Sequence, residues 1–371
     1  MRVERVETVA YSLPFAEPYV TARGEIRERE MVLLRLRTDA GWDGLGEAVP
    51  LALRGDKPLA KVEAEIADAA RRLTGLELDE SHEDPLAFGV ATMLELSISK
   101  RISRAASAAI ECALFDAVAK ASGIPVWGLL KVPGAEPVEV NATLTSGTPD
   151  EVAAEAAEWA GEGYRTVKLK LGAGHDDVAT VEAVREAVGP GVKIRLDANE
   201  AWDAKLATDI LRLVEAFGIE LAEQPVSGLR AMARVAGDVG IPLAADEAIS
   251  SEAEAHRAVQ RGSCAYATAK LSKVGGFGPA RQIARILPTY LSSALDGPVG
   301  IAAAAHGAQV LRADGTDPGI AHGLATQRLF AETIASRECE LRDGMLHLPE
   351  GPGLGVELDE DALERHSIPK G

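Results

Sequence analysis

The sequence predicts an α/β protein, a (β/α)8 TIM-type barrel with an α+β capping domain. Short apolar β-like runs alternate with amphipathic helices from about residue 131 to 335, at roughly 25 residues per unit, the repeat length of a βα unit. The 371 residues suit a barrel with one additional domain. No glycine-rich phosphate turn follows the first strand of the repeat, which disfavours a doubly wound open sheet.

The capping domain is predicted over residues 1–130. It begins with two β-rich runs and a polar turn, and continues with two helices whose apolar residues follow helical spacing. These elements are expected at residues 6–13 and 31–38, at 41–46 for the turn, and at 60–73 and 105–121 for the helices. The second helix ends at Gly123-Ile124-Pro125, a typical helix-ending signal.

The barrel is predicted over residues 131–335. Its eight strands are expected at residues 138–144, 166–169, 193–196, 220–222, 243–245, 266–269, 290–294 and near 319–322. Helices rich in Ala, Glu and Arg are expected between them, for example at 151–160, 178–188 and 204–215. Eight units exceed the usual strand number of an open doubly wound sheet. The last segment, residues 336–371, has strand and turn character and is expected to return to the capping domain.

The overall composition indicates which classes of protein fit this chain. Hydrophobic residues make up 47% of the chain and charged residues 26%, which is typical of a globular protein. The 39 basic and 57 acidic residues give a net charge of −18 and no basic footprint, so we expect no nucleic-acid partner. No stretch approaches 18 apolar residues, the start lacks an apolar signal core, and three widely spaced cysteines indicate a reducing compartment. We expect a cytoplasmic protein without membrane contact.

Ionisable residues recur at the carboxyl ends of five consecutive predicted strands. They are Lys168 and Lys170, Asp197 with Asn199, Glu223, Asp246, and Lys270. The intervals from Lys170 onward are 27, 26, 23 and 24 residues, each one βα unit. A single carboxylate at a strand end is usually a helix cap or a solvated loop residue. Five in register indicate an active site, because barrel enzymes place their chemistry on this face.

Three carboxylates at one level of a barrel mouth repel one another unless a cation lies among them. Oxygen ligands suit a hard ion, so Asp197, Glu223 and Asp246 predict Mg²⁺, with Mn²⁺ as a substitute. Such an ion can hold the carboxylate of a small-molecule substrate while its α-proton leaves. Lys170 and Lys270 flank the carboxylates and are expected to approach the substrate from opposite faces. We place Lys168 on the other pleat of the strand, where its charge would help to depress the pKa of Lys170.

With these residues in place, the sequence resembles the enolase superfamily, in particular its muconate-lactonising-enzyme subgroup. The resemblance covers nearly the whole chain. The matching stretches are Gly-Leu-Gly-Glu-Ala-Val-Pro at 44–50, the helix at 109–116, Val-Lys-Leu-Lys at 167–170, Asp-Ala-Asn at 197–199, Glu-Gln-Pro at 223–225, Ala-Asp-Glu at 245–247, and Lys270 with Val-Gly-Gly at 274–276. Each motif is weak alone, but together and in order they are specific.

The resemblance implies Mg²⁺ ligation by Asp197, Glu223 and Asp246. It makes Lys170 and Lys270 the acid/base pair and Lys168 an electrostatic helper, a pattern that differs from the histidine base of the mandelate-racemase branch. Loops near residues 18–29 and 51–56 of the capping domain would close over the substrate. The substrate-binding candidates are Asn199, Arg23, Arg54, Ser292, Ser293 and His322, whereas His306 lies on a predicted helix and is expected to be structural. The fold often forms homo-oligomers, and the sequence leaves the oligomeric state open.

Three reactions of the subgroup are in competition: o-succinylbenzoate synthesis (a dehydration in menaquinone synthesis), muconate cycloisomerisation, and racemisation of N-succinylamino acids or dipeptides. Dipeptide epimerases carry an Asp-x-Asp near the eighth strand, and residues 319–326 have no acidic pair. Residues 140–144, 292–296 with 299–300, and 322–326 resemble o-succinylbenzoate synthases, so we favour the synthase. A non-catalytic binding protein on the same barrel is disfavoured by the complete set of three carboxylates and two lysines.

Overall fold

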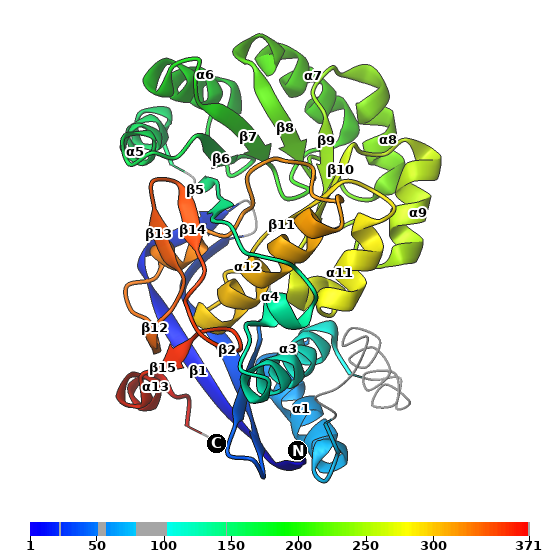
Figure 1. The fold of residues 1–371 in the computed structure, drawn as a ribbon. Coiled ribbons are helices and arrows are strands. Elements are labelled where there is room, and N and C mark those ends of the chain that lie inside the picture. The colour runs from blue at the N-terminus through cyan, green and yellow to red at the C-terminus, as the bar shows by residue number, and fades with distance from the viewer. Residues whose placement is uncertain (22–23, 51–56, 79–101, 146, 370–371) are drawn as a thin grey trace.

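A computed structural model describes residues 1–21, 24–50, 57–78, 102–145 and 147–369. A curled parallel sheet surrounded by helices lies beside a long antiparallel sheet, which confirms the predicted α/β barrel with its α+β capping domain (Figure 1). The candidates Arg23 and Arg54 lie outside the described residues. Among the described residues, no helix has the length and apolar character needed to cross a membrane.

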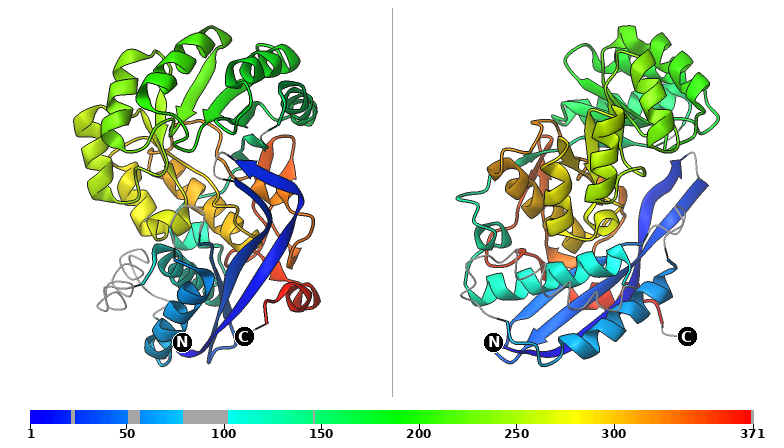
Figure 2. Two further views of the ribbon diagram at one scale, coloured as in Figure 1. Left: turned by 180° about the vertical axis from the view of Figure 1, so that it is seen from behind. Right: turned by 90° about the vertical axis from the view of Figure 1, so that its right-hand side faces the viewer.

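The capping domain is an antiparallel sheet of β1 (Val3–Thr21), β2 (Gly24–Thr38) and β3 (Asp43–Ala48), in that order. It carries helices α1 (Leu59–Leu73), α3 (Arg104–Ala121) and the short α4 (Val126–Leu129). Helix α1 buries an apolar stripe at helical spacing, Val62, Ile66, Ala69 and Leu73. Helix α3 begins at the side-chain cap of Ser103 and is buried around most of its circumference. Figure 2 shows both helices lying across the same face of the sheet.

The predicted turn at residues 41–46 is wrong in its second half, because Gly44 and Gly46 lie in strand β3. The reason is packing. A Cβ atom at Gly46 would lie 1.9 Å from the carbonyl oxygen of Ala109, and one at Gly44 would lie 2.0 Å from that of Ala113. The glycines therefore allow the backbone of α3 to pack directly on β3.

The barrel sheet has seven regular parallel strands, in the order β5 to β11. They are β5 (Ala142–Leu144), β6 (Thr166–Lys170), β7 (Lys193–Asp197), β8 (Ile219–Glu223), β9 (Leu243–Ala245), β10 (Tyr266–Ala269) and β11 (Thr289–Leu291). The helices that connect them are α5 (Pro149–Gly161), α6 (Asp177–Val188), α7 (Ala204–Val214) with η2 (Glu215–Phe217), α8 (Leu229–Asp238), α9 (Glu252–Arg261), α10 (Leu271–Val274), α11 (Phe277–Ala284) and α12 (Pro298–Ala313). They cover the outside of the sheet in Figure 1.

The eighth unit of the barrel is irregular. Single parallel bridges join Val140 to His322 and Ser292 to Gly323, so this segment closes the barrel between β11 and the start of β5 without forming a longer strand. It is followed by the short 3-10 helix η3 (Thr326–Leu329) instead of an eighth barrel helix. The barrel thus closes as predicted, but its last repeat lacks the expected helix.

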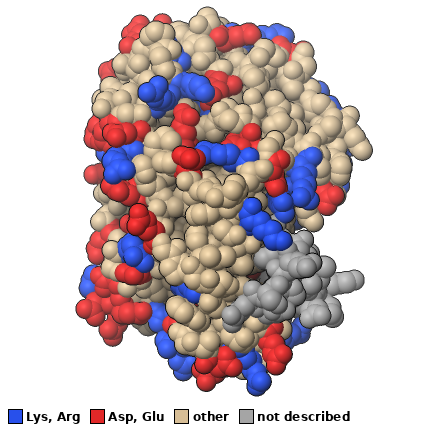
Figure 3. Space-filling model, viewed as in Figure 1, with Lys and Arg blue, Asp and Glu red and all other residues tan. Residues whose placement is uncertain are grey.

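The C-terminal segment lies along the capping domain. It contains β12 (Ala335–Arg337), β13 (Glu340–Arg342), β14 (Met345–His347), β15 (Glu357–Leu358) and α13 (Glu360–His366). Strand β14 pairs with β4 (Val138–Glu139), just before the barrel begins. Two backbone N–H groups, of Ala331 and Ile368, donate to β1 carbonyls at 2.9 and 2.8 Å. On the face seen in Figure 3, basic and acidic side chains lie in scattered groups, and residues without charge cover much of the middle.

Helix α3 is attached to the barrel through a buried carboxylate. Glu111 accepts hydrogen bonds from the backbone N–H groups of Phe277 and Gly278, at the start of α11. Burial raises the pKa of Glu111 to about 7, against the lowering effect of these two N–H groups. Gly276 precedes this contact at φ +121°, and a Cβ atom there would lie 1.9 Å from Glu111 Oε2.

Gly276→Ala is therefore expected to lower the free energy of unfolding by at least about 2 kcal/mol, because backbone strain and a steric clash add together. Gly262→Ala is the matched control, since Gly262 has φ +61° but open space around its Cα. It should lose only about 1 kcal/mol. Urea unfolding of both variants measures the difference, and equal losses would contradict the clash with Glu111.

A second buried carboxylate, Glu47 of β3, joins the capping domain to α12. Its Oε1 accepts a hydrogen bond from Gly297 N at 2.6 Å, and its Oε2 accepts from Val299 N and Gly300 N at 3.2 and 3.3 Å. These N–H groups begin the helix and would otherwise lack partners, so the carboxylate acts as a cap supplied from another part of the chain.

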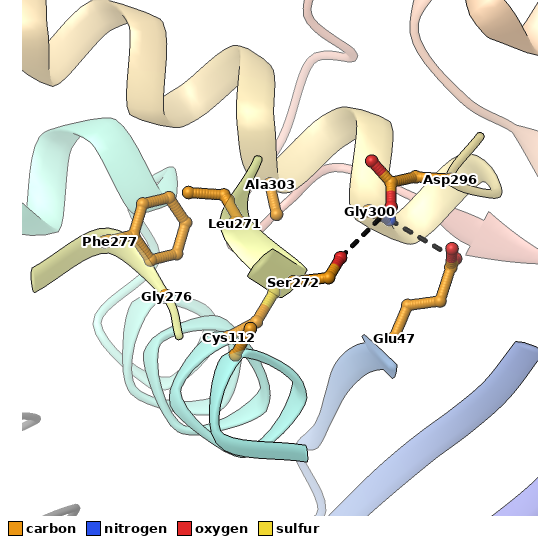
Figure 4. A pocket seen from close by; sticks show the side chains of 10 residues that line it. Glu47, Cys112, Leu271, Ser272, Gly276, Phe277, Asp296, Gly300 and Ala303 are labelled. Atoms are coloured by element: carbon orange, nitrogen blue, oxygen red, sulfur yellow. Dashed lines mark hydrogen bonds between the residues drawn. The ribbon is translucent and has the colours of Figure 1, made fainter. Parts of the chain in front are cut away.

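Glu47 borders a cavity of about 10 Å³, the lower limit for one water molecule, together with Cys112, Ser272 and Asp296 (Figure 4). Burial and then the charge of Asp296 raise the pKa of Glu47 to about 7, although the helix N–H groups oppose the shift. A raised folded-state pKa means that the associated stability is complete below the unfolded value, near 4.5, and is lost as the pH rises toward 7.

Between pH 5 and pH 8 the wild-type protein should therefore lose more stability than Glu47→Gln, by on the order of 2 kcal/mol. Glutamine keeps an oxygen for the helix N–H groups but has no charge to bury. Thermal unfolding followed across this pH range tests the expectation, with the exposed Glu4→Gln as control. Parallel stability profiles for wild type and Glu47→Gln would show that Glu47 does not titrate in this range.

Candidate active site

The predicted ionisable residues meet at the carboxyl ends of the barrel strands. Lys170, Asp197 and Glu223 are Cα partners across β6, β7 and β8. Asp246 follows β9 directly, and Lys270 follows β10. All five side chains are buried, with at most 8% of any residue exposed. Ion pairs between lysines and carboxylates of different strands join these side chains inside the barrel, at the strand ends where barrel enzymes place their active sites.

Two lysines of β6 contact the first carboxylate. Lys170 Nζ lies 2.6 Å from Asp197 Oδ2, and Lys168 Nζ lies 2.9 Å from the same oxygen. Lys168 also donates to Glu223 Oε2 at 2.7 Å. The expectation that Lys168 lies on the other pleat is wrong, because it is two residues from Lys170 and shares its face.

Lys168 is strongly favoured in its charged form. Burial lowers its pKa, but the charges of Asp197 and Glu223 outweigh burial and raise the pKa well above its ordinary value. Lys168 therefore remains an ammonium group between two carboxylates. This fits an electrostatic contribution better than proton transfer.

The third carboxylate is held by lysines from the other side of the barrel. Lys270 Nζ donates to Asp246 Oδ2 at 2.5 Å, and Lys273 Nζ donates to Asp246 Oδ1 at 2.7 Å. Lys273 also donates to the backbone carbonyl of Thr268 at 2.8 Å. Sequence reasoning missed Lys273, although it lies three residues after Lys270 on the short α10, where helical spacing turns its side chain back toward the strand end.

The turns after β7 and β8 contain left-handed backbone conformations. Asn199 has φ 45°, Glu200 65° and Gln224 38°. Such conformations are costly for residues other than glycine and gather at functional sites. Asn199 Oδ1 accepts from Lys170 Nζ at 2.9 Å, and Gln224 Oε1 accepts from Asp246 N at 2.9 Å. The strained turns thus orient a lysine and a carboxylate of the mouth.

A layer of polar side chains lies deeper in the barrel than the mouth, two residues before the strand ends. Tyr290 O–H donates to Glu223 Oε2 at 2.5 Å and accepts from Thr268 Oγ1 at 2.8 Å. The guanidinium carbon of Arg195 lies 5.0 Å from the centre of the Tyr290 ring. Sequence reasoning missed Thr268 and Tyr290, although each lies two residues before a mouth residue, Lys270 and Ser292, and so faces inward as well.

The remaining candidates for substrate binding lie on β11 and the eighth segment. Ser292 Oγ lies 3.5 Å from Gly323 O, and Ser293 Oγ accepts from Asp296 N at 2.8 Å. His322 Nδ1 accepts from Leu291 N at 2.9 Å, while its Nε2 lies 3.7 Å from Asp317 Oδ2. The polar atoms of Ser293 and His322 are thus engaged within the barrel wall. A contact of any of the three with substrate remains a prediction.

The predicted structural role of His306 fits its surroundings. Its Nδ1 accepts from Trp127 N at 3.1 Å, and its Nε2 lies 3.3 Å from Leu354 O. Burial lowers the pKa of His306 to about 4, against the raising effect of the Leu354 carbonyl, so the ring is neutral at pH 7.

The mouth offers oxygen ligands that suit a hard cation. In the part of the chain that the structure describes, no three His, Cys, Asp or Glu side chains converge closely enough to hold a metal ion, because lysine ammonium groups lie among the carboxylates. Among the proposed ligands, Glu223 nevertheless has a buried oxygen, Oε1, without a hydrogen-bond partner in the described structure. An all-oxygen donor set on adjacent strands and this unpartnered carboxylate oxygen fit Mg²⁺ held by Asp197, Glu223 and Asp246.

The fold and the mouth define a capped α/β-barrel enzyme with paired lysines and carboxylates at its strand ends. The chain belongs to the enolase superfamily, in the muconate-lactonising-enzyme subgroup. Residues 151–362 match the family "Enolase C-terminal domain-like", and residues 4–131 match "Mandelate racemase / muconate lactonizing enzyme, N-terminal domain".

Individual relatives cover most of the chain. It is 32% identical to the L-Ala-D/L-Glu epimerase of Bacillus subtilis, over 82% of this chain and 84% of the relative. It is 31% identical to muconate cycloisomerase 1 of Pseudomonas putida, over 98% of each. A solved dipeptide epimerase from Enterococcus faecalis, in complex with Mg and L-Leu-L-Tyr, superposes with a TM-score of 0.86 at 27% identity, covering 96% of this chain and all of that one (100%).

Proposed function

We propose that this protein catalyses a Mg²⁺-dependent reaction that begins with removal of the proton α to a substrate carboxylate. The observation that carries the proposal is the placement of Lys170 on β6 and Lys270 after β10, on either side of the strands that carry Asp197, Glu223 and Asp246. Three carboxylates between two lysines can hold a cation, and each lysine can reach a different face of a bound substrate.

The residues of the mouth have separate roles in this reaction. A magnesium ion held by the three carboxylates supplies positive charge to a substrate carboxylate that gains electron density. A lysine acts as a base only in its neutral form, and Lys170 accepts the α-proton in that form. Lys168 stays charged and compensates Asp197 and Glu223. Asn199, which accepts from Lys170 Nζ, orients that lysine toward the mouth.

We further propose dehydration, the o-succinylbenzoate synthase reaction, as the overall change. After the α-proton has moved to a lysine, the bond between the β-carbon and its hydroxyl oxygen breaks. The hydroxyl leaves as water with a proton from a lysine ammonium group, and a new carbon–carbon double bond forms. Racemisation of N-succinylamino acids shares the first step. Cycloisomerisation of muconate reaches an enolate by addition of one carboxylate oxygen to a double bond, and a lysine ammonium group then donates a proton to the α-carbon. These two reactions are the alternatives.

The charge of the mouth supports an anionic substrate. With Lys170 as the neutral base, the ammonium groups of Lys168, Lys270 and Lys273 face the carboxylates of Asp197, Glu223, Asp246 and Glu247. A magnesium ion held there would add two positive charges and leave a net charge of +1, which favours a carboxylate over an ammonium group on the substrate. The dehydration substrate, N-succinylamino acids and muconate all have two carboxylates, whereas a dipeptide also carries an ammonium group.

The eighth segment argues against dipeptides in a second way. Residues 319–326 contain no acidic side chain that could bind an ammonium group. A Cβ atom at Gly323 would lie 2.5 Å from Ser292 Oγ, so the segment packs against β11 and has no room for a side chain without a shift. The chain therefore differs here from the dipeptide epimerases that it otherwise resembles.

The test is product analysis with the dehydration substrate, N-succinylamino acids, cis,cis-muconate and L-Ala-D-Glu, each with Mg²⁺ and with chelator. The highest kcat/KM is expected for dehydration. Dominant dipeptide turnover would replace the overall reaction but keep the shared first step. Dominant muconate turnover would replace proton removal by carboxylate addition as the first step. Metal-independent turnover, or none with any of the four, would overturn the proposed first step itself.

A further inference from the structure

We infer that Tyr290 is a positioning residue that holds one oxygen of Glu223 so that the other is presented to the metal ion. The inference rests on the proposed function, because it assumes that Glu223 is a metal ligand. It adds to the site a residue from β11, a strand that carries none of the proposed ligands.

The two oxygens of Glu223 have different surroundings. Oε2 accepts hydrogen bonds from Tyr290 at 2.5 Å and from Lys168 at 2.7 Å, whereas Oε1 is buried without a partner. The whole residue has 0% exposure, so water does not compensate Oε1 in this position. A buried carboxylate oxygen without a donor is unfavourable unless a cation binds to it.

The direction of the Tyr290 hydrogen bond is fixed by its neighbours. Thr268 Oγ1 donates to the phenol oxygen at 2.8 Å, and Thr268 and Tyr290 are Cα partners across β10 and β11. The phenol has a single hydrogen, and an ionised carboxylate can only accept. The Tyr290 hydrogen therefore points at Glu223 Oε2.

The ring itself has little freedom to move away. Tyr290 is 1% exposed and packs with Leu221 and Ala244 in the barrel interior. Arg195, which is fully buried, lies with its guanidinium carbon 5.0 Å from the ring centre. The phenol is thus held from three directions: by apolar packing, by a cation over the ring, and by the Thr268 hydroxyl.

Tyr290 supplies something that Lys168 cannot. Lys168 Nζ is shared between Asp197 Oδ2 at 2.9 Å and Glu223 Oε2 at 2.7 Å, and it brings a positive charge that competes with a metal ion. The phenol is a neutral donor that fixes the carboxylate without reducing its charge. Hydrogen bonds that orient a metal ligand from outside the coordination sphere typically change metal affinity by about 10- to 100-fold.

The test is calorimetric titration of the metal-free protein with Mg²⁺ alone, without substrate. Tyr290→Phe keeps the ring and removes the hydroxyl, so the Kd for Mg²⁺ is expected to rise about 10- to 100-fold. Tyr164→Phe is the matched control. This tyrosine is also buried, but it precedes β6 at the end of the strand opposite to Lys170, and its Kd should equal that of wild type.

Turnover provides a second readout. In Tyr290→Phe the Mg²⁺ concentration needed for half-maximal rate should rise with the Kd, while kcat at saturating Mg²⁺ stays within about threefold of wild type. Thr268→Val keeps the phenol but removes the contact that directs its hydrogen, and should weaken Mg²⁺ binding by a few-fold. If Tyr290→Phe does not fold, the Kd of Thr268→Val for Mg²⁺ tests the positioning role instead.

The outcomes separate this inference from the proposed function. A Kd for Mg²⁺ in Tyr290→Phe that equals the wild-type value overturns the positioning role and leaves the proposed reaction intact. If Tyr290→Phe does not fold, a wild-type Kd in Thr268→Val has the same meaning. A reduced kcat that excess Mg²⁺ does not restore also overturns the positioning role. Wild-type protein that binds no Mg²⁺ overturns the proposed function, and this inference with it.

Discussion

Lys170→Ala and Lys270→Ala are each expected to lower turnover by about 100- to 10,000-fold, the usual contribution of a general acid or base. Both lysines are buried at the strand ends, and each is paired with one of the proposed metal ligands, at 2.6 Å to Asp197 and 2.5 Å to Asp246. Removal of either leaves one face of the substrate without a proton acceptor or donor. Steady-state kinetics with the preferred substrate measures the loss.

The control for these variants is Lys205→Ala. Lys205 lies on α7 with 86% of its side chain exposed, and it pairs with Asp209 on the same helix, away from the mouth. Its removal should leave kcat/KM unchanged. Mg²⁺ affinity and folded-state circular dichroism of the two active-site variants must also be preserved for the losses to be chemical. Full activity in both Lys170→Ala and Lys270→Ala would refute the acid/base assignment.

Asp246→Asn is expected to have the second large effect, on metal binding and on stability together. Asp246 accepts from Lys270 at its Oδ2 and from Lys273 at its Oδ1, so the neutral amide leaves two ammonium groups in the barrel without a compensating charge. Breaking such a buried pair costs about 3 kcal/mol or more. The same change removes a charged metal ligand, and turnover should fall at least about 100-fold.

Urea unfolding of the metal-free protein measures the first loss, and titration with Mg²⁺ measures the second. Asp209→Asn is the matched control, because it also removes a carboxylate that pairs with a lysine, but at a half-exposed position on α7. That pair should contribute no more than about 1 kcal/mol. If Asp246→Asn were as stable as Asp209→Asn and still bound Mg²⁺ like wild type, Asp246 would not be a ligand.

The repeat spacing predicted the strand-end residues that gather at the mouth, although not Lys273 of the short α10. Parallel barrel strands end on the same face, so intervals of one βα unit bring Lys170, Asp197, Glu223 and Asp246 together whatever the loops between them do. The same argument fails for the eighth unit. His322 and Gly323 form only single bridges, because side-chain and backbone hydrogen bonds replace a regular strand there.

The residues missed in the sequence act through other residues. Thr268 and Tyr290 lie in buried strands. The sequence pattern predicts that these strands are buried, but it does not predict what their hydroxyl groups contact. The predicted turn at residues 41–46 includes too many residues, because glycine usually indicates a turn. Here Gly44 and Gly46 instead make room for the backbone of α3, a contact made by residues far apart in sequence.

The overall reaction is the part that neither the spacing nor the fold determines. Relatives of similar identity carry the names of an epimerase and a cycloisomerase, and solved structures of such enzymes share this fold. The predicted capping loop at residues 18–29 is wrong, because residues 18–21 and 24–29 lie in strands β1 and β2. Residues 51–56 lie outside the described residues, and residues 319–326 contain no acidic pair.

The central claim is that this mouth removes a proton α to a carboxylate with the help of Mg²⁺. The most direct measurement is exchange of the α-proton of an N-succinylamino acid in D2O, followed by proton NMR with wild-type protein. Deuterium is expected to enter the α-position with Mg²⁺ present, to stop entering with chelator, and to enter again when Mg²⁺ is restored. Racemisation of the N-succinylamino acid without this exchange, or exchange that continues undiminished in chelator, would contradict the claim.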